Sequence, residues 1–116
     1  MAKYYEEAPM REIREAFERE VLDWPGVKPN KRFGCPCYEA KGKLFAFIVT
    51  GGVVLTALGA EEKKALAKRF FGTARVAFRL PPKWSTVGVR TPMDLGRVYD
   101  FARMSYQNAL ASPKKK

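Results

Sequence analysis

Two cysteines on either side of a proline are the first residues of this chain whose types and spacing could do chemistry. Cys35-Pro36-Cys37 offers two thiolates, which bind zinc well, but a structural zinc site usually takes four nitrogen or sulfur ligands. The chain has no histidine and no third cysteine. We therefore expect neither a metal nor a cofactor, and we interpret both cysteines as small apolar core residues on one strand face. A homodimer that pools four cysteines is the alternative.

Groups for catalysis are not assembled in the sequence. The absence of histidine removes the commonest general base. No glycine-rich phosphate loop of the usual spacing is present, and Asp94 and Asp100 have no evident catalytic partner. We expect no enzymatic activity and no small-molecule substrate.

Basic residues are the second chemical feature of the chain. There are 22 Lys and Arg against 12 Asp and Glu, which gives a net charge of +10. Residues 1–24 hold four of the basic residues and seven of the acidic ones, so the positive charge belongs to the rest of the chain. Such a field attracts nucleic acid, anionic membrane surfaces or acidic proteins, and its sign does not choose between them.

Three helices are predicted from apolar spacing and from end signals. The first runs from Pro9 to Asp23, with an apolar residue every fourth position at Ile13, Phe17 and Val21. The second covers residues 60–71 and carries acids near its start and bases near its end. The third begins after Thr91, a natural N-cap that is followed by proline.

Five strands are predicted between these helices. Glycine turns at residues 41–42 and 51–52 join strands at 34–40, 43–50 and 53–58, and a second hairpin pairs 74–80 with 84–90. Pro36 suits an edge strand. The order α-β-β-β-α-β-β-α predicts a two-layer α+β domain with an antiparallel sheet.

Two-residue turns would fix how these strands pair. Across the turn at 41–42, Tyr38 is then opposite Phe45, Cys37 opposite Ala46 and Cys35 opposite Ile48. Across the turn at 51–52, Ile48 is opposite Leu55 and Ala46 is opposite Ala57. Both faces of this sheet are apolar, so one is the core and the other needs cover from a helix edge, a second subunit or a ligand. In the second hairpin Arg75 is opposite Arg90, a pairing of like charges that a bound anion would explain, although solvated arginines are equally compatible with it.

These placements single out a basic surface with aromatic residues interleaved, which is typical of nucleic-acid binding. Aromatic residues at the spacing of Tyr38, Phe45 and Phe47 are also common in cores. The candidate contacts are Lys41, Lys43, Arg75, Arg79, Lys83, Trp84 and Arg90.

One domain over residues 1–112 and a disordered basic tail over 113–116 are expected. The N-terminus has no secretory signal, and the longest apolar run is far below the ~20 residues that span a bilayer. We expect a cytoplasmic protein with no membrane association, and two cysteines without a disulfide framework agree with a reducing compartment.

Several short segments together resemble the MmcQ/YjbR family: the N-terminal helix, "KGKLFAFI", "PPKWSTVGV" and "ARMSYQNAL". "GKLFAFI" followed by "GGVVLTAL" is also similar to the N-terminal domain of TfoX-like proteins, the competing assignment. The positions that match the first family are Lys43, Phe45, Trp84, Ser105 and Tyr106, and "CPC" departs from its pattern.

The resemblance implies the same element order, in the fold group that includes type III secretion chaperones. It also implies a small cytoplasmic protein without established enzymatic activity, for which DNA binding through two hairpin wings has been proposed. We therefore expect a non-enzymatic DNA-binding protein that uses basic β-hairpins. The alternative is a protein-interaction or adaptor module, a homodimer that associates through an apolar sheet face.

Overall fold

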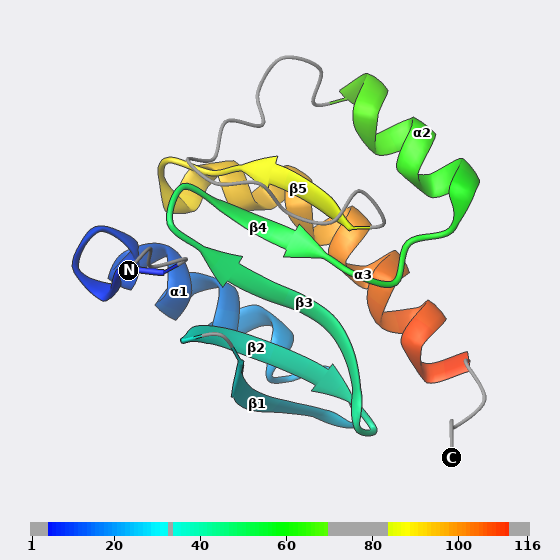
Figure 1. Ribbon diagram of the computed structural model, residues 1–116, viewed down its shortest axis with the longest axis horizontal. Coiled ribbons are helices and arrows are strands. Elements are labelled where there is room, and N and C mark those ends of the chain that lie inside the picture. The colour runs from blue at the N-terminus through cyan, green and yellow to red at the C-terminus, as the bar shows by residue number, and fades with distance from the viewer. Residues whose placement is uncertain (1–4, 33, 70–83, 112–116) are drawn as a thin grey trace.

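A five-stranded antiparallel sheet forms the centre of the fold in the computed structural model, which describes residues 5–32, 34–69 and 84–111 (Figure 1). The strands are adjacent in chain order: β1 (Val27–Arg32), β2 (Cys35–Ala40), β3 (Lys43–Val49), β4 (Gly52–Leu55) and β5 (Ser85–Gly88). Three α-helices lie in the described ranges: α1 (Glu7–Val21), α2 (Ala60–Arg69) and α3 (Leu95–Ala111). A 3₁₀ turn, η1 (Pro92–Asp94), leads into α3. The chain is a compact α+β domain.

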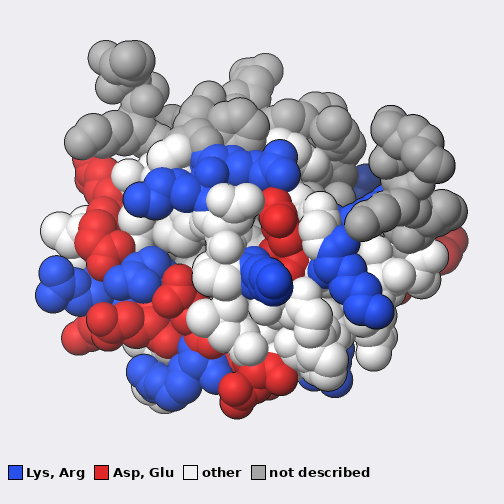
Figure 2. All heavy atoms as spheres, turned by 90° about the horizontal axis from the view of Figure 1, so that it is seen from below, with Lys and Arg blue, Asp and Glu red and all other residues white. Residues whose placement is uncertain are grey.

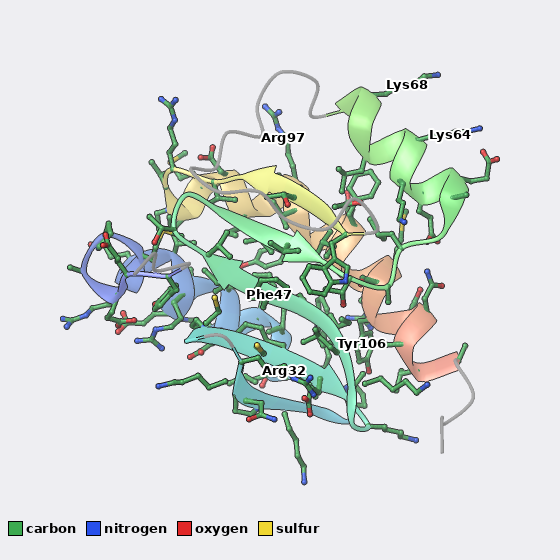
Figure 3. The ribbon with its side chains drawn as sticks, in the orientation of Figure 1. Arg32, Phe47, Lys64, Lys68, Arg97 and Tyr106 are labelled. Atoms are coloured by element: carbon green, nitrogen blue, oxygen red, sulfur yellow. The ribbon has the colours of Figure 1, made fainter. Side chains whose placement is uncertain are left out.

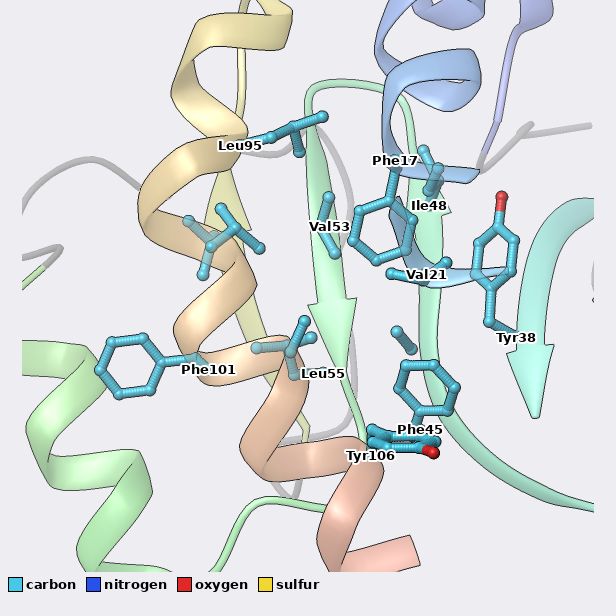
Figure 4. Packing of buried hydrophobic residues seen from close by; sticks show 14 of the residues in the cluster. Phe17, Val21, Tyr38, Phe45, Ile48, Val53, Leu55, Leu95, Phe101 and Tyr106 are labelled. Carbon is cyan, nitrogen blue, oxygen red and sulfur yellow. The ribbon is translucent and has the colours of Figure 1, made fainter. Parts of the chain in front are cut away.

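The main core lies between the sheet and two helices, α1 and α3, which cover one of its faces (Figures 1 and 4). The predicted stripe of α1 is confirmed, because Ile13, Phe17 and Val21 are all buried. The other members labelled in Figure 4 come from the sheet and from α3: Tyr38, Phe45, Ile48, Val53, Leu55, Leu95, Phe101 and Tyr106. Burial of this apolar surface drives the two layers together.

β1 corrects the predicted element order. The sequence interpretation places no strand at residues 27–32, where "VKPNKR" lacks apolar alternation and contains a proline. They pair with β2 in an antiparallel ladder from Val27 opposite Ala40 to Arg32 opposite Cys35. The described part therefore begins with one helix and four strands, not three. β2 consequently lies inside the sheet, and the expectation that Pro36 marks an edge strand is wrong.

The register between β2 and β3 is also corrected. Near the turn Ala40 is opposite Lys43, as expected, but beyond an irregularity Tyr38 is opposite Ala46 and Cys37 is opposite Phe47. Phe45 is the extra residue of a β-bulge, so it and Ala46 both pack in the main core. Every residue of β2 beyond the bulge has therefore shifted by one position relative to β3.

The β3–β4 turn lies earlier than expected. Ile48 is opposite Val53 and Ala46 is opposite Leu55, so the turn uses residues 50 and 51 instead of the two glycines. A Cβ atom on Gly52 would lie 2.5 Å from the carbonyl oxygen of Val87, so glycine here permits the close approach of β5. The shift by two positions keeps each side chain on its expected face of β4.

A second apolar cluster occupies the other sheet face. Cys35 and Cys37 lie there with Phe47, Val49 and Val54, and all of these side chains are at most 2% exposed. Both cysteines are thus core residues on one strand face, as predicted. This second apolar face is therefore covered within the chain, and the homodimer alternative stays a prediction.

Several predictions lie outside the described residues. They are the strand at 74–80 with its pairing of Arg75 and Arg90, and the tail at 113–116. None of the described helices is long and apolar enough to cross a membrane.

Candidate nucleic-acid interface

β1 is the most exposed strand of the described sheet. Five of its six residues are exposed, and three of these are basic: Lys28, Lys31 and Arg32. Because Val27 packs against the main core, alternation puts Lys31 on the helix side of the strand and Lys28 and Arg32 on the other side. The cations therefore straddle this edge of the sheet.

Alternate residues of β1 direct their backbone N–H and C=O groups away from the sheet. The Lys41 N–H donates to the Gly26 carbonyl at 3.0 Å, immediately before the ladder. In an antiparallel ladder, hydrogen-bonded pairs alternate with non-bonded pairs, so every second residue of β1 directs its backbone groups away from β2. These outward residues are Val27, Pro29 and Lys31.

None of the three outward positions offers a free N–H. The Val27 N–H donates to the Trp24 carbonyl at 3.2 Å, and Pro29 has no N–H. The Lys31 N–H donates to Oδ1 of Asn30 at 2.8 Å. The edge therefore has no outward N–H to donate to another strand, which disfavours strand addition, and its basic side chains are what it presents to a partner.

Two of the predicted contacts lie beside this edge. Lys41 is exposed in the β2–β3 turn, and Lys43 begins β3, where it is half-buried and engaged in an interaction of its own. We call Lys28, Lys31, Arg32 and Lys41 the basic edge. Figure 2 looks from the side on which β1 lies, and basic side chains spread across that view while acidic ones gather mainly toward α1.

Among the remaining predicted cations, the structure describes one, Arg90, and it does not lie near Lys41 and Lys43. Arg90 is exposed but follows β5 at the opposite end of the sheet, where the neighbouring Val89 N–H bonds to Gly51. Seven residues of β3 separate the two ends, roughly 20 Å at strand spacing. Arg75, Arg79 and Lys83 lie outside the described residues.

The aromatic residues expected beside these cations are mainly core residues. Tyr38, Phe45 and Phe47 are at most 2% exposed. Trp84 is half-buried, and its ring packs edge-to-face on Phe47 with centroids 5.2 Å apart. In the described ranges the exposed large hydrophobic residues are Leu22 and Met93, neither of which is aromatic. The basic edge thus offers cations without a stacking platform.

The sequence interpretation missed the β1 cations, although a signal was present. Lysines and a proline in a short polar stretch next to apolar strands are the pattern by which proteins protect a sheet edge. The stretch "KPNKR" has that composition. It was missed because strand prediction relied on apolar alternation.

A hydrogen-bonded chain between α1 and β2 was also missed. Arg14 binds Glu7 through Nε and Nη2 at 3.0 and 2.8 Å, and Glu18 through Nη1 at 3.0 Å. Tyr5 donates to Glu7, and Tyr38 donates to Glu18 at 2.8 Å. We call these five residues the Arg14 chain.

The pKa shifts in the Arg14 chain indicate a structural role. Hydrogen bonds from Arg14 and Tyr5 lower the pKa of Glu7 to about 2. Burial and then the Glu7 carboxylate raise the pKa of Tyr5 to about 12, and burial with the Glu18 bond raises the pKa of Tyr38. A carboxylate this well paired is a weak base, so the chain stabilises α1 against β2 and is not built for proton transfer.

The family-like positions Ser105 and Tyr106 have structural contacts. The Ser105 hydroxyl donates to the carbonyl of Phe45, the bulged residue, at 2.6 Å and accepts the Ala57 N–H at 3.0 Å. The Tyr106 hydroxyl donates to the Pro25 carbonyl. These contacts attach α3 to the sheet and to the loop that precedes β1.

The cysteine thiols lack the setting of a reactive or metal-binding site. Burial raises the pKa of Cys35 to about 11, with a smaller contribution from Cys37, and burial also raises the pKa of Cys37. Within the described ranges, no three His, Cys, Asp or Glu side chains lie close enough to hold a metal ion.

Comparison with known proteins gives no assignment: no protein-family model, no curated protein and no solved structure matches this chain. The resemblance to the MmcQ/YjbR family stays a prediction, and the function must be argued from the site.

Proposed function

We propose that this protein binds double-stranded DNA without enzymatic activity, through contacts of the basic edge with backbone phosphates. The observation that carries the proposal is the composition of β1, an exposed strand with three cations and no free outward N–H. Lys41 extends the row beyond β1. Four cations clustered along one edge of the sheet suit a polyanion with regularly spaced charges.

The acidic first helix would orient the protein on DNA. α1 exposes Glu12, Glu15 and Glu20, which a phosphate backbone repels. DNA would therefore lie along β1 and away from α1. Because no exposed aromatic side chain accompanies the described part of the edge, binding would depend on charge and show little sequence preference.

Charge removal on two matched surfaces tests the proposal. The edge variant is Lys28→Gln, Lys31→Gln and Arg32→Gln; the control is Lys64→Gln, Lys68→Gln and Arg97→Gln. The control residues project from α2 and α3, away from β1 (Figure 3). Both variants lose three positive charges, so any difference between them reflects position and not net charge.

Binding to a 20-base-pair duplex is measured by fluorescence anisotropy over a series of salt concentrations. If about four phosphates are neutralised, log affinity should fall with log salt at a slope of about −3.6, from a dissociation constant near micromolar at low salt. The edge variant should bring the slope to about −1, and the control should leave it near the original value. Equal losses in both variants, or no binding by the unmodified protein at low salt, would reject the proposal.

A further inference from the structure

Lys41 has a backbone conformation that lysine adopts reluctantly. Its φ is +52°, and it is the only described residue other than glycine with a positive φ. The next residue, Gly42, has φ +85°, so the turn needs two residues in the left-handed region. Asparagine followed by glycine is the sequence that best suits such a turn. A lysine here opposes local preference, and such residues gather at functional sites.

The surroundings of Lys41 accommodate its side chain. Gly26, with φ +81°, lies beneath it, and a Cβ atom at position 26 would come within 3.3 Å of Cγ of Lys41. Glycine at position 26 therefore leaves room for the lysine stem. The two residues are also joined by the Lys41 N–H bond to the Gly26 carbonyl.

A second lysine shares this part of the surface. Gly26, Lys28, Glu39, Lys41 and Gly42 line one surface depression. Its carboxylate, Glu39, is occupied by Arg32 at 3.0 Å and by the Asn30 amide at 3.3 Å. Among the described residues, neither Lys28 nor Lys41 forms a salt bridge. Two lysines thus line the depression while its carboxylate is already paired.

We propose that Lys41 and Lys28 form a phosphate-binding notch, the strongest single contact of the basic edge with a nucleic-acid backbone. The inference rests on the proposed function. It adds that Lys41, which occupies a turn position better suited to asparagine, contacts the phosphate directly. Lys41 has a backbone conformation that disfavours lysine, and it lies beside a second lysine without a salt bridge. An anionic ligand that binds both ammonium groups explains this arrangement. The ligand group is a phosphodiester.

Lys41→Asn separates this role from a structural one. Asparagine relieves the backbone conflict, so the melting temperature should rise by about 2–5 °C or stay unchanged. Duplex affinity should fall about fivefold at low salt, and the salt slope should lose about 0.9. A structural role would predict the opposite sign for stability. Lys64→Asn on α2 is the control for the loss of one charge, and it should change affinity less than twofold.

The outcomes separate the inference from the proposed function. If Lys41→Asn weakens binding no more than Lys64→Asn, while the triple edge variant still brings the salt slope to about −1, the notch is rejected and the basic edge survives. If Lys41→Asn lowers the melting temperature by several degrees, the lysine is structural and the notch is rejected. If the unmodified protein does not bind the duplex, the proposed function itself fails.

Discussion

At the scale of single residues, Glu7 is a carboxylate whose ionisation is tied to folding. It accepts two hydrogen bonds from Arg14 and one from Tyr5, which lower its pKa from an ordinary 4.5 to about 2. Arg14 continues to Glu18 and so to Tyr38 of β2. Arg14 therefore connects Glu7, at the start of α1, with the sheet through Glu18 and Tyr38. Protonation of Glu7 would weaken this connection and lower the stability of the fold.

Acid should destabilise the protein through Glu7. Because the folded pKa lies below the unfolded one, Glu7 contributes stability above about pH 4.5, and this contribution is lost as the pH falls toward 2. Glu7→Gln should lower the free energy of unfolding at pH 7 and flatten its decrease between pH 4.5 and 2. Urea titrations at a series of pH values measure both effects.

Glu12→Gln is the matched control on the same helix, since Glu12 is exposed. It should leave the pH dependence unchanged. If the free energy of unfolding of Glu7→Gln has the same pH dependence as that of the unmodified protein, the Arg14 chain does not contribute to stability through Glu7.

At the scale of elements, the edge strand β1 combines protection with charge. Pro29 and the Asn30 side chain leave no free outward N–H at positions 29 and 31, while the basic side chains stay exposed. Each feature alone would be ordinary for an edge strand. Their combination leaves electrostatic contact as the mode of interaction that the described edge supports.

Unblocking β1 should make the protein self-associate. Pro29→Thr with Asn30→Ala supplies an N–H at position 29 and frees the N–H of Lys31, so two copies could pair through their β1 edges. Sedimentation velocity over a range of loading concentrations should show a larger species that grows with concentration. Asn30→Asp, which keeps an acceptor for the Lys31 N–H, should sediment like the unmodified protein, and the same behaviour of the double variant would contradict the edge-blocking argument.

The contrast between α1 and β3 explains which parts of the fold the sequence could predict. The stripe of Ile13, Phe17 and Val21 is a local pattern, and the helix it predicted is present. The bulge at Phe45 is contacted by Ser105, 60 residues away, whose hydroxyl donates to the bulged carbonyl. No pattern local to the strand contains that contact, so the predicted register failed beyond the bulge.

The candidate site was predictable only in part, for a similar reason. Lys41 and Lys43 follow from a glycine turn, which is a local signal. Lys28 and Arg32 become neighbours of that turn only because β1 pairs with β2. Arg90, which is equally basic and exposed, lies at the far end of the sheet because β5 pairs with β4. Strand order decides which cations can act together, and the sequence interpretation lacked β1.

At the scale of the whole molecule, charge is divided between the acidic first helix and the basic edge of the sheet (Figure 2). This division predicts one orientation on DNA, with β1 near the backbone and α1 facing away. The native cysteines allow a direct measurement, because both thiols are fully buried and have raised pKa values. A cysteine introduced on the surface would therefore take a label selectively.

A photo-activated cross-linker placed at two exposed positions tests this orientation. Lys31→Cys puts the probe on β1, and Glu15→Cys puts it on α1. At low salt, irradiation with a 20-base-pair duplex should give at least about ten times more cross-linked DNA from position 31, even though that variant has lost one basic contact and the other has lost a repelling carboxylate. The unmodified protein, treated with the same reagent, should give none while it is folded. Equal yields from the two positions would mean that DNA binds without a preferred side, so the charge distribution would not orient the protein on DNA.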